Sequence, residues 1–274
     1  GKVEGIVTHL GQKITAKSVV VCTGVYLDSH IIIGNKFTKC GPNGFMRATE
    51  LTKSLQKLGL TIKRFKTGTP MRVDKRTIDF GKLEEQAGVE NLPNFSVKTK
   101  KKTKNVTSCY IGYTNEHTHE IIRNNLDKSP LYQGMITGIG PRYCPSIEDK
   151  IVRFADKNRH QFFVEPEAMS TNEVYIQGIS TSLPWEVQKE IIHSIAGMEN
   201  AWLMRYAYAI EYDAIDATQL NATLEYKNIS GLYFAGQVNG TSGYEEAGGQ
   251  GILAGMNASL KNQGKKQIVL TRNQ

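Results

Sequence analysis

The feature that most limits how this chain can fold is an apolar strand that stops at a glycine and leads into a glycine-rich helix. Residues 231–237 read Gly-Leu-Tyr-Phe-Ala-Gly-Gln, and their spacing predicts a short buried strand that ends at Gly236. Gly240 and Gly243 follow, and a long helix is expected over Gly243–Leu260. Such a loop directs backbone N–H groups and the positive end of a helix toward an anion. The pattern favours an α/β fold with a nucleotide close to this turn.

The predicted helix is unusually rich in small residues, which are Ala247, Gly248, Gly251, Ala254, Gly255 and Ala258. Glycine inside a helix costs about 1 kcal/mol relative to alanine, so several glycines need a reason. A closely approaching cofactor is one reason. Tight packing against a sheet is the other.

A second buried strand is expected over Lys17–Cys22, because Val19, Val20 and Val21 form a continuous apolar run that ends at Thr23-Gly24. A β-hairpin that turns at Gly11 is expected before it, over Val3–His9 and Lys13–Ala16. Further strands are predicted over Leu60–Lys66, Phe162–Glu165, Val174–Ile176 and Ala201–Ala209, and helices over Glu50–Leu58, Asp79–Gln86, Thr118–Leu126, Pro145–Lys157 and Pro184–Ser194.

The charge balance is basic, with 34 Lys and Arg against 26 Asp and Glu and a net charge of +8. This balance favours an anionic partner, although a soluble basic protein without one has the same composition. Five lysines in Lys98–Lys104 predict a solvated loop, with a role near phosphates as the alternative. No apolar run is long enough to cross a membrane. The four cysteines form no CxxC pair, so a zinc site is not expected and a reducing cytoplasm fits best.

A reactive cysteine is predicted in the segment GIGPRYCPSIEDKIVRFADK, residues 138–157. Pro145 suits the first turn of a helix, so Cys144 lies at the helix start with Arg142 two residues before it. Both features favour the thiolate and lower the pKa of a cysteine. A thiolate of this kind can add to an electrophilic carbon and later leave. A buried structural cysteine is the alternative.

Two other polar groups remain as weaker candidates. His117 and His119 have no third ligand placed by the sequence, so no metal site is predicted. Glu211, Tyr212 and Asp213 follow a predicted strand and are interpreted as a surface turn, with acid/base chemistry as the alternative.

Several long motifs, in order, resemble the MnmG (GidA) family. They are Lys66-Thr-Gly-Thr-Pro70, Arg76-Thr-Ile-Asp-Phe80, Gly140-Pro-Arg-Tyr-Cys-Pro-Ser-Ile-Glu-Asp149, Gly178-Ile-Ser-Thr-Ser-Leu-Pro184, Tyr208-Ala-Ile-Glu-Tyr-Asp213, and Phe234-Ala-Gly-Gln through Tyr244-Glu-Glu-Ala247. The resemblance implies an FAD- and NADH-dependent enzyme that works with the GTPase MnmE. Such enzymes install an aminomethyl or carboxymethylaminomethyl group at C5 of the tRNA wobble uridine, with methylene-tetrahydrofolate as the one-carbon donor. A cytoplasmic homodimer is also implied.

The resemblance implies site residues as well. Cys144 corresponds to one of two catalytic cysteines. The FAD contacts would include Gly24, Thr49, Gly236 and Gln237. The NAD segment would comprise Gly140, Pro141, Arg142, Tyr143, Cys144, Pro145, Ser146, Ile147, Glu148, Asp149, Lys150, Ile151, Val152, Arg153 and Phe154.

The sequence departs from the family pattern in ways that shape the expected fold. It contains no GxGxxG loop, no second catalytic cysteine and no C-terminal helical domain. Ala48 stands where a flavin-contacting serine is usual. We therefore expect an α/β chain with a partial, Rossmann-like FAD-binding domain over residues 1–27 and 228–264. Residues 28–227 would form a large α/β insertion and residues 265–274 a tail.

Three expectations about activity follow. The isolated chain is expected to be inactive, because it lacks the phosphate-binding loop. A folate- and FAD-dependent tRNA uridine methyltransferase of the TrmFO type is one alternative. A non-catalytic tRNA-binding fragment is the other, and in it Lys98–Lys104 would dominate binding.

Overall fold

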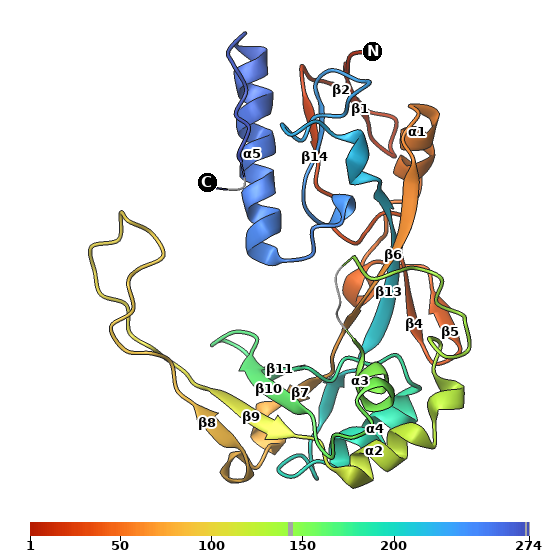
Figure 1. The fold of residues 1–274 in the computed structure, drawn as a ribbon, viewed down its shortest axis with the longest axis vertical. Helices are drawn as coiled ribbons and strands as arrows, with labels where there is room; N and C mark the ends of the chain where they lie inside the picture. Colours follow the sequence, from red (N-terminus) through yellow and green to blue (C-terminus); the bar gives the residue numbers. More distant parts are fainter. Residues whose placement is uncertain (142–144, 272, 274) are drawn as a thin grey trace.

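Two long antiparallel strands, β6 (Ile62–Thr69) and β13 (Tyr208–Ile215), run through the middle of the molecule and connect its two ends. The protein is described here by a computed structural model, which describes residues 1–141, 145–271 and 273. One end holds a parallel strand pair and a long helix, and the other holds an antiparallel sheet with three helices (Figure 1). The β6–β13 pair is therefore the structural connection between the two ends.

The four-stranded sheet that contains this pair has the order β5-β4-β13-β6. Its other two strands are β4 (His30–Ile33), which pairs with β13, and β5 (Lys36–Thr38), which lies at the edge beyond β4. Strand β13 lies inside the sheet, with β4 on one side and β6 on the other, and its residues after Tyr208 are all buried. A strand in this position has no solvated face, so any charged side chain on it must find a partner.

The end with the long helix is built from β3 (Val19–Val21) and β14 (Leu232–Phe234), which pair in parallel in the register Val19–Leu232 to Val21–Phe234. Helix α5 (Tyr244–Asn262) packs against both strands. A hairpin of β1 (Gly5–Val7) and β2 (Lys13–Thr15) and helix α1 (Leu51–Lys57) lie at the same end of the molecule (Figure 1). The predicted strand–glycine–helix unit and the predicted hairpin are confirmed.

The opposite end carries a six-stranded antiparallel sheet in the order β12-β7-β11-β10-β9-β8. Its strands are β7 (Arg72–Asp74), β8 (Glu84–Gln86), β9 (Cys109–Tyr113), β10 (Gln161–Pro166), β11 (Glu173–Gln177) and β12 (Leu203–Arg205). Helices α2 (Glu116–Arg123), α3 (Ile147–Arg153) and α4 (Trp185–His193) contribute Ile122, Ile147, Ile151, Ile191 and other apolar side chains to its core.

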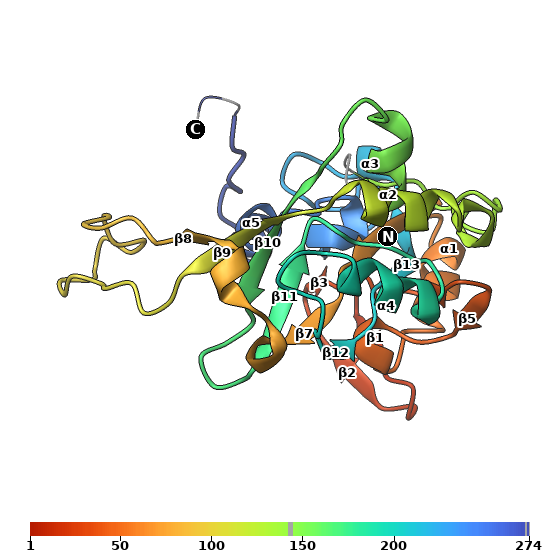
Figure 2. The same cartoon turned by 90° about the horizontal axis from the view of Figure 1, so that it is seen from below.

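A long connection between β8 and β9 projects away from the body of the molecule in both views (Figures 1 and 2). It contains the lysines of Lys98–Lys104, all of which are exposed, and the fully exposed side chains of Phe95 and Val97. We call residues 87–108 the lysine arm. The predicted solvated loop is confirmed.

Three predictions about local structure were wrong. Asp79–Gln86 is not a helix, since only Phe80–Lys82 makes a 3₁₀ turn and Glu84–Gln86 pairs with β9. Ala201–Ala209 is not one strand, because β12 and β13 enter different sheets. Glu211–Asp213 is not a surface turn, because the segment lies in the middle of β13. In each case pairing with a distant strand overrides the local pattern.

The mixed α/β class is as expected. Among the residues that the structure describes, we find no helix with the length and apolar character needed to span a bilayer.

Candidate functional site

The centre of the molecule holds a buried carboxylate, Glu211 on β13, which orients the chain just before the Gly140–Phe154 segment. Its Oε1 accepts hydrogen bonds from the backbone N–H groups of Thr137 at 2.8 Å and Gly138 at 2.5 Å. Its Oε2 lies 2.9 Å from Nε2 of His30, the residue directly opposite on β4. Burial alone would raise the pKa of Glu211, but the hydrogen bonds from His30, Gly138 and Thr137 lower it to about 2. Glu211 is therefore an anion that anchors this loop.

The protonation pattern of His30 follows from its two partners. Arg64 Nη2 lies 2.7 Å from His30 Nδ1. A guanidinium can only donate, so Nδ1 accepts and Nε2 carries the hydrogen that is donated to Glu211. In its Nε2–H form, His30 therefore bridges Arg64 and Glu211 through two hydrogen bonds.

A second cross-strand pair continues the same network. Arg64 on β6 lies opposite Asp213 on β13, and its Nη1 donates to Asp213 Oδ1 at 2.8 Å. The other oxygen of Asp213 accepts from the Thr52 hydroxyl at 2.8 Å, and Arg64 also donates to the carbonyl of Asp28 at 3.0 Å. Polar side chains on β4, β6, β13 and helix α1 are thereby joined into one network next to the 137–139 loop.

The predicted NAD segment begins beside this network and continues into α3. Ser146 is the N-cap of α3, and its hydroxyl accepts from the Asp149 N–H at 3.3 Å. Pro145 therefore precedes the cap and is not in the first helical turn, which corrects the sequence-based expectation. The predicted helix is confirmed but ends at Arg153, because its short apolar face, Ile147 and Ile151, is all that the core accommodates.

The loop 178–183 holds the start of α3 through several hydrogen bonds. Ile147 N–H donates to the Ser180 carbonyl at 2.8 Å, and the Lys150 ammonium donates to the Gly178 carbonyl at 2.6 Å. Glu148, which is completely buried, accepts from the Thr181 hydroxyl at 2.7 Å. Burial raises the pKa of Glu148. The two motifs that the sequence carries separately, Gly140–Asp149 and Gly178–Pro184, are thus one structural unit.

The remaining residues of the predicted NAD segment, Gly140–Phe154, differ in how far they are buried, and three of them lie outside the described residues. Gly140 and the side chains of Val152, Arg153 and Phe154 are exposed, whereas Pro141, Asp149 and Lys150 are half-buried. Arg142, Tyr143 and Cys144 lie outside the described residues, so the predicted reactive cysteine remains a sequence-based prediction.

The predicted FAD contacts gather at one edge of the parallel strand pair. Gly24 follows β3 and Gly236 follows β14, so both lie where the carboxyl ends of parallel strands meet. Ala48 pairs with Leu27 in the segment after Gly24, and the adjacent Thr49 is exposed. Open carboxyl ends of parallel strands are where nucleotides bind in α/β sheets.

The turn after β14 is ordered by the chain itself. Gly236 has a φ of +81°, and its N–H donates to the Gln250 side chain of α5 at 2.9 Å. The turn Gly236–Asn239 contacts β13, where the buried Tyr212 hydroxyl has no hydrogen-bond partner among the described residues and burial raises the pKa of Tyr212 to about 12. The glycine turn is therefore connected to the same strand that carries Glu211.

The glycine face of α5 has no neighbour within the described chain. A Cβ built at Gly248, Gly249, Gly251 or Gly255 would meet no atom within 4 Å. Ile252 on this helix is 67% exposed. The first turn of α5 carries its own carboxylates, Glu245 and Glu246, which interact favourably with the positive helix end. Packing within this part of the chain does not account for the glycines.

A family model described as glucose inhibited division protein A matches residues 1–266. The chain belongs to the GidA family. A relative from Clostridium botulinum (strain Loch Maree / Type A3), the tRNA uridine 5-carboxymethylaminomethyl modification enzyme MnmG, is 54% identical over 271 residues, covering 99% of this chain and 43% of the relative. The enzyme of the same name from Ligilactobacillus salivarius (strain UCC118) is 55% identical over 276 residues, which cover 99% of this chain and 43% of that relative.

The solved structure of Aquifex aeolicus GidA in its form I crystal superposes with a TM-score of 0.92 at 52% identity, covering 99% of this chain and 46% of that chain. The chain thus spans less than half the length of these GidA-family relatives.

The other candidates have structural roles. His119 is buried and its Nε2 lies 2.8 Å from the Thr114 hydroxyl, whereas His117 is exposed on the same helix. Within residues 1–141, 145–271 and 273, no cluster of three or more His, Cys, Asp or Glu is arranged to hold a metal ion.

The sequence analysis missed the network of His30, Arg64 and Glu211. The available signal was the set of apolar residues on both sides of Glu211-Tyr212-Asp213, which is typical of a strand inside a sheet.

Proposed function

We propose that this GidA-family chain forms part of an enzyme that modifies C5 of the wobble uridine in tRNA, adding an aminomethyl or carboxymethylaminomethyl group. The observation that carries the proposal is the family match over residues 1–266, together with more than 50% identity to enzymes named for tRNA uridine 5-carboxymethylaminomethyl modification. The buried Glu211 network supports it, because it holds the loop that leads to Cys144 in one position.

The chemistry that we assign to Cys144 is covalent activation of the uracil. Its thiolate adds to C6, and the electron pair of the C5–C6 double bond moves toward the C4 carbonyl, which makes C5 nucleophilic. After C5 has bonded to the one-carbon unit, loss of the C5 proton and departure of the thiolate restore the double bond and the free cysteine. Methylene-tetrahydrofolate is the proposed one-carbon donor, and FAD and NADH would supply the redox equivalents when bound.

We assign FAD to the edge formed by Gly24, Thr49, Gly236 and Gln237. The fit rests on the carboxyl ends of β3 and β14 and on the glycine face of α5, where added Cβ atoms would meet only open space. NADH is assigned to Gly140–Phe154, whose helix α3 is fixed by the 178–183 loop. Strand β13 connects the two assignments, because it contacts the Gly236–Asn239 turn and carries Glu211, which holds the loop before Gly140.

We assign a tRNA contact to the lysine arm. The arm projects away from the body of the protein (Figures 1 and 2), and its lysines are all exposed: Lys98, Lys100, Lys101, Lys102 and Lys104. Clustered, exposed lysines bind phosphates and release counterions. MnmE as a protein partner, a homodimer and a cytoplasmic location complete the proposal.

The test is a Cys144→Ser variant of the full-length enzyme, with Cys109→Ser as the matched control, since Cys109 is a half-buried cysteine of β9. We expect Cys144→Ser to abolish the modified nucleoside, measured by mass spectrometry of digested tRNA, while tRNA binding is retained. Cys109→Ser should leave both unchanged. Normal modification by Cys144→Ser would overturn the nucleophile assignment.

The same mass spectra separate this proposal from the methyltransferase alternative, which the comparisons do not favour. A TrmFO-type enzyme adds a single methyl group to uridine, whereas the proposed enzyme adds a nitrogen-containing group. A non-catalytic fragment leaves the uridine unmodified in every variant.

A separate measurement tests the expected inactivity of the isolated chain. We expect the purified 274-residue chain to show little flavin absorbance, because its sequence contains no GxGxxG phosphate-binding loop. Stoichiometric FAD on this chain would contradict that expectation.

A further inference from the structure

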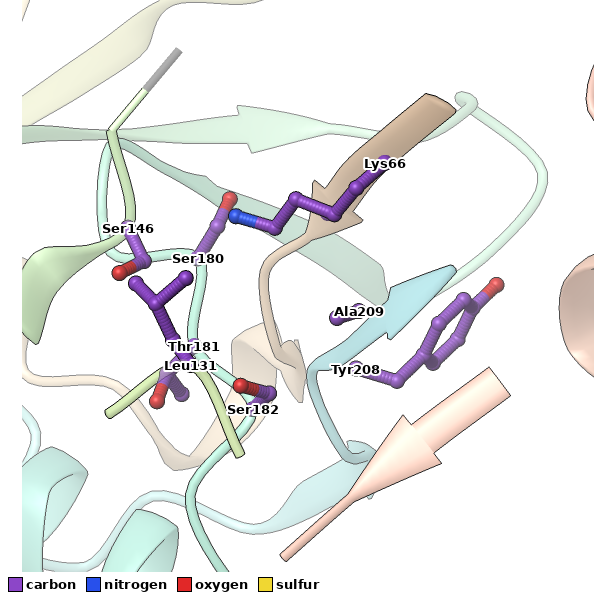
Figure 3. A pocket seen from close by; sticks show the side chains of 9 residues that line it. Lys66, Leu131, Ser146, Ser180, Thr181, Ser182, Tyr208 and Ala209 are labelled. Carbon is purple, nitrogen blue, oxygen red and sulfur yellow. The ribbon is translucent and has the colours of Figure 1, made fainter. Parts of the chain in front are cut away.

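A pocket beside the start of α3 contains a lysine that no described acidic group neutralises. Lys66 on β6 lines this pocket together with Ser146, Ser180 and Ser182. Figure 3 shows its side chain extending from the strand toward Ser180 and Ser146. Within residues 1–141, 145–271 and 273, its ammonium has neither an ion pair nor a hydrogen bond, although the lysine is half-buried. Placing a cation there is unfavourable unless an anion joins it.

Two of the surrounding hydroxyls are also available to a ligand. Across the described residues, neither the Ser180 nor the Ser182 hydroxyl makes a hydrogen bond to protein, and both line the pocket. By contrast, the Thr181 hydroxyl donates to Glu148 and the Ser146 hydroxyl caps Asp149. The pocket therefore presents one ammonium and two free hydroxyls. An ammonium has only donors, so its complement is a group with several acceptor oxygens.

Two carboxylates close to this pocket, Glu211 and Glu148, are not paired with Lys66, and Oε2 of Glu148 has no hydrogen-bond partner among the described residues. Glu211 lies directly opposite Lys66 in the β6–β13 register, but its oxygens accept from His30, Thr137 and Gly138. Glu148 is buried behind Ser146 and Thr181, and its Oε1 accepts from Thr181. Neither carboxylate comes within ion-pair distance of the Lys66 ammonium, so neither neutralises it.

We propose that Lys66, Ser180 and Ser182 form a binding site for a phosphate group of a substrate. Lysine and hydroxyl donors converge on phosphate oxygens in many proteins, and a partly desolvated ammonium strengthens the contact. The phosphate belongs either to the dinucleotide or to the tRNA backbone, the two phosphorylated ligands of the proposed function, on which this inference rests. Lys66, Ser180 and Ser182 lie outside the predicted NAD segment, on β6 and on the loop that supports α3, and Ser146 of that segment lines the same pocket.

The experiment measures binding by the full-length enzyme with Lys66→Met, which keeps the length of the side chain and removes its charge. Lys63→Met is the matched control, because Lys63 lies on the same strand but is exposed and paired with Asp216 at 3.0 Å. NADH and tRNA are titrated separately, and inorganic pyrophosphate is added as a competitor. A Ser180→Ala, Ser182→Ala double variant tests the hydroxyls.

We expect Lys66→Met to weaken one of the two ligands about tenfold and to weaken inhibition by pyrophosphate in parallel, whereas Lys63→Met changes neither. A loss for NADH identifies the dinucleotide as the source of the phosphate, and a loss for tRNA identifies the RNA. The thermal melting temperature should not fall, because the ammonium has no protein partner to lose. Unchanged affinity for both ligands, or a lower melting temperature with unchanged affinity, would overturn the site.

These readouts are independent of the proposed reaction. Binding is measured without turnover, so a failure of the Lys66 site leaves the Cys144→Ser test intact. A failure of the Cys144 assignment likewise leaves the phosphate site standing.

Discussion

Glycine is used in opposite ways in two regions of this molecule. At Gly138 an added Cβ would lie 2.8 Å from the carbonyl carbon of Phe65 and 3.0 Å from Glu211 Oε1, so the chain itself requires a residue without a side chain. On α5 an added Cβ at Gly251 would meet nothing within 4 Å. The first glycine is explained by internal packing, and the second is not. The difference shows that the Glu211 region is tightly packed by its own chain, whereas the described residues leave the glycine face of α5 open.

The largest effect is expected from Glu211→Ala in the tightly packed region. The substitution leaves the N–H groups of His30, Thr137 and Gly138 without their acceptor, so we expect a loss of about 3–5 kcal/mol in the free energy of unfolding. Urea denaturation measures this. Glu245→Ala, which removes an exposed carboxylate on α5, is the control and should change stability by less than about 0.5 kcal/mol. Equal losses in the free energy of unfolding would show that the Glu211 region depends no more on its internal contacts than the α5 face does.

The pH dependence of the free energy of unfolding gives a second test of the contribution of Glu211. The pKa of Glu211 is about 2 in the folded state, against an ordinary value of 4.5. As the pH falls below 4.5, the unfolded chain takes up the proton first, so the contribution of Glu211 is complete above pH 4.5 and is lost on the way down to pH 2. We expect it to be about 3 kcal/mol. The stability difference between the wild type and Glu211→Gln should shrink across this window. A difference that stays constant from pH 7 to pH 2 contradicts the assignment.

Gly138→Ala should be destabilising by about 1–3 kcal/mol, because the new Cβ overlaps the backbone of Phe65 and must displace it or the 137–139 loop. Modification of tRNA should fall as well, since this loop precedes the segment that carries Cys144. The free energy of unfolding and the yield of modified nucleoside are the two measurements. A free energy of unfolding within about 0.5 kcal/mol of the wild type would show that the 137–139 loop shifts at little energetic cost and would contradict the prediction.

Gly251→Ala on α5 should have the opposite sign. Alanine favours the helix by about 1 kcal/mol over glycine, and the open face accepts its methyl group, so the chain should become more stable. FAD retention by the full-length enzyme, read from flavin absorbance, should fall if the cofactor approaches this face. Higher stability with unchanged FAD retention would refute the cofactor explanation for this glycine.

The smallest effect on stability is expected on the lysine arm. Replacing Lys98, Lys100 and Lys101 with alanine should change the free energy of unfolding by less than about 0.5 kcal/mol, because these side chains are exposed. The same variant should bind tRNA more weakly and with a shallower salt dependence. Replacement of the exposed lysines Lys2, Lys13 and Lys36 is the charge-matched control. An unchanged salt slope would exclude the arm as a tRNA contact.

Local patterns predicted the elements whose cause lies within a few residues. The strand Leu232–Phe234, the helix Tyr244–Asn262 and the hairpin at Gly11 follow from apolar runs, helical spacing and a turn glycine. Family motifs similarly placed Gly24 and Gly236 in one group, and the parallel pairing of β3 and β14 puts them at one edge. The helix predicted over Asp79–Gln86 failed because Glu84–Gln86 gains more from pairing with β9 than from a turn of helix.

The sequence by itself determined the family, the mixed α/β class, the strand–glycine–helix unit and Cys144 as a candidate nucleophile. The tertiary structure decided the environment of the charged residues. In the sequence alone, Glu211 and Asp213 resemble residues of a surface turn. In the folded chain, His30 and Arg64 lie opposite them on neighbouring strands. A carboxylate is stable inside a sheet only when such partners are present, and those partners lie 181 and 149 residues away in the chain. Only the pairing of β13 with β4 and β6 brings them together.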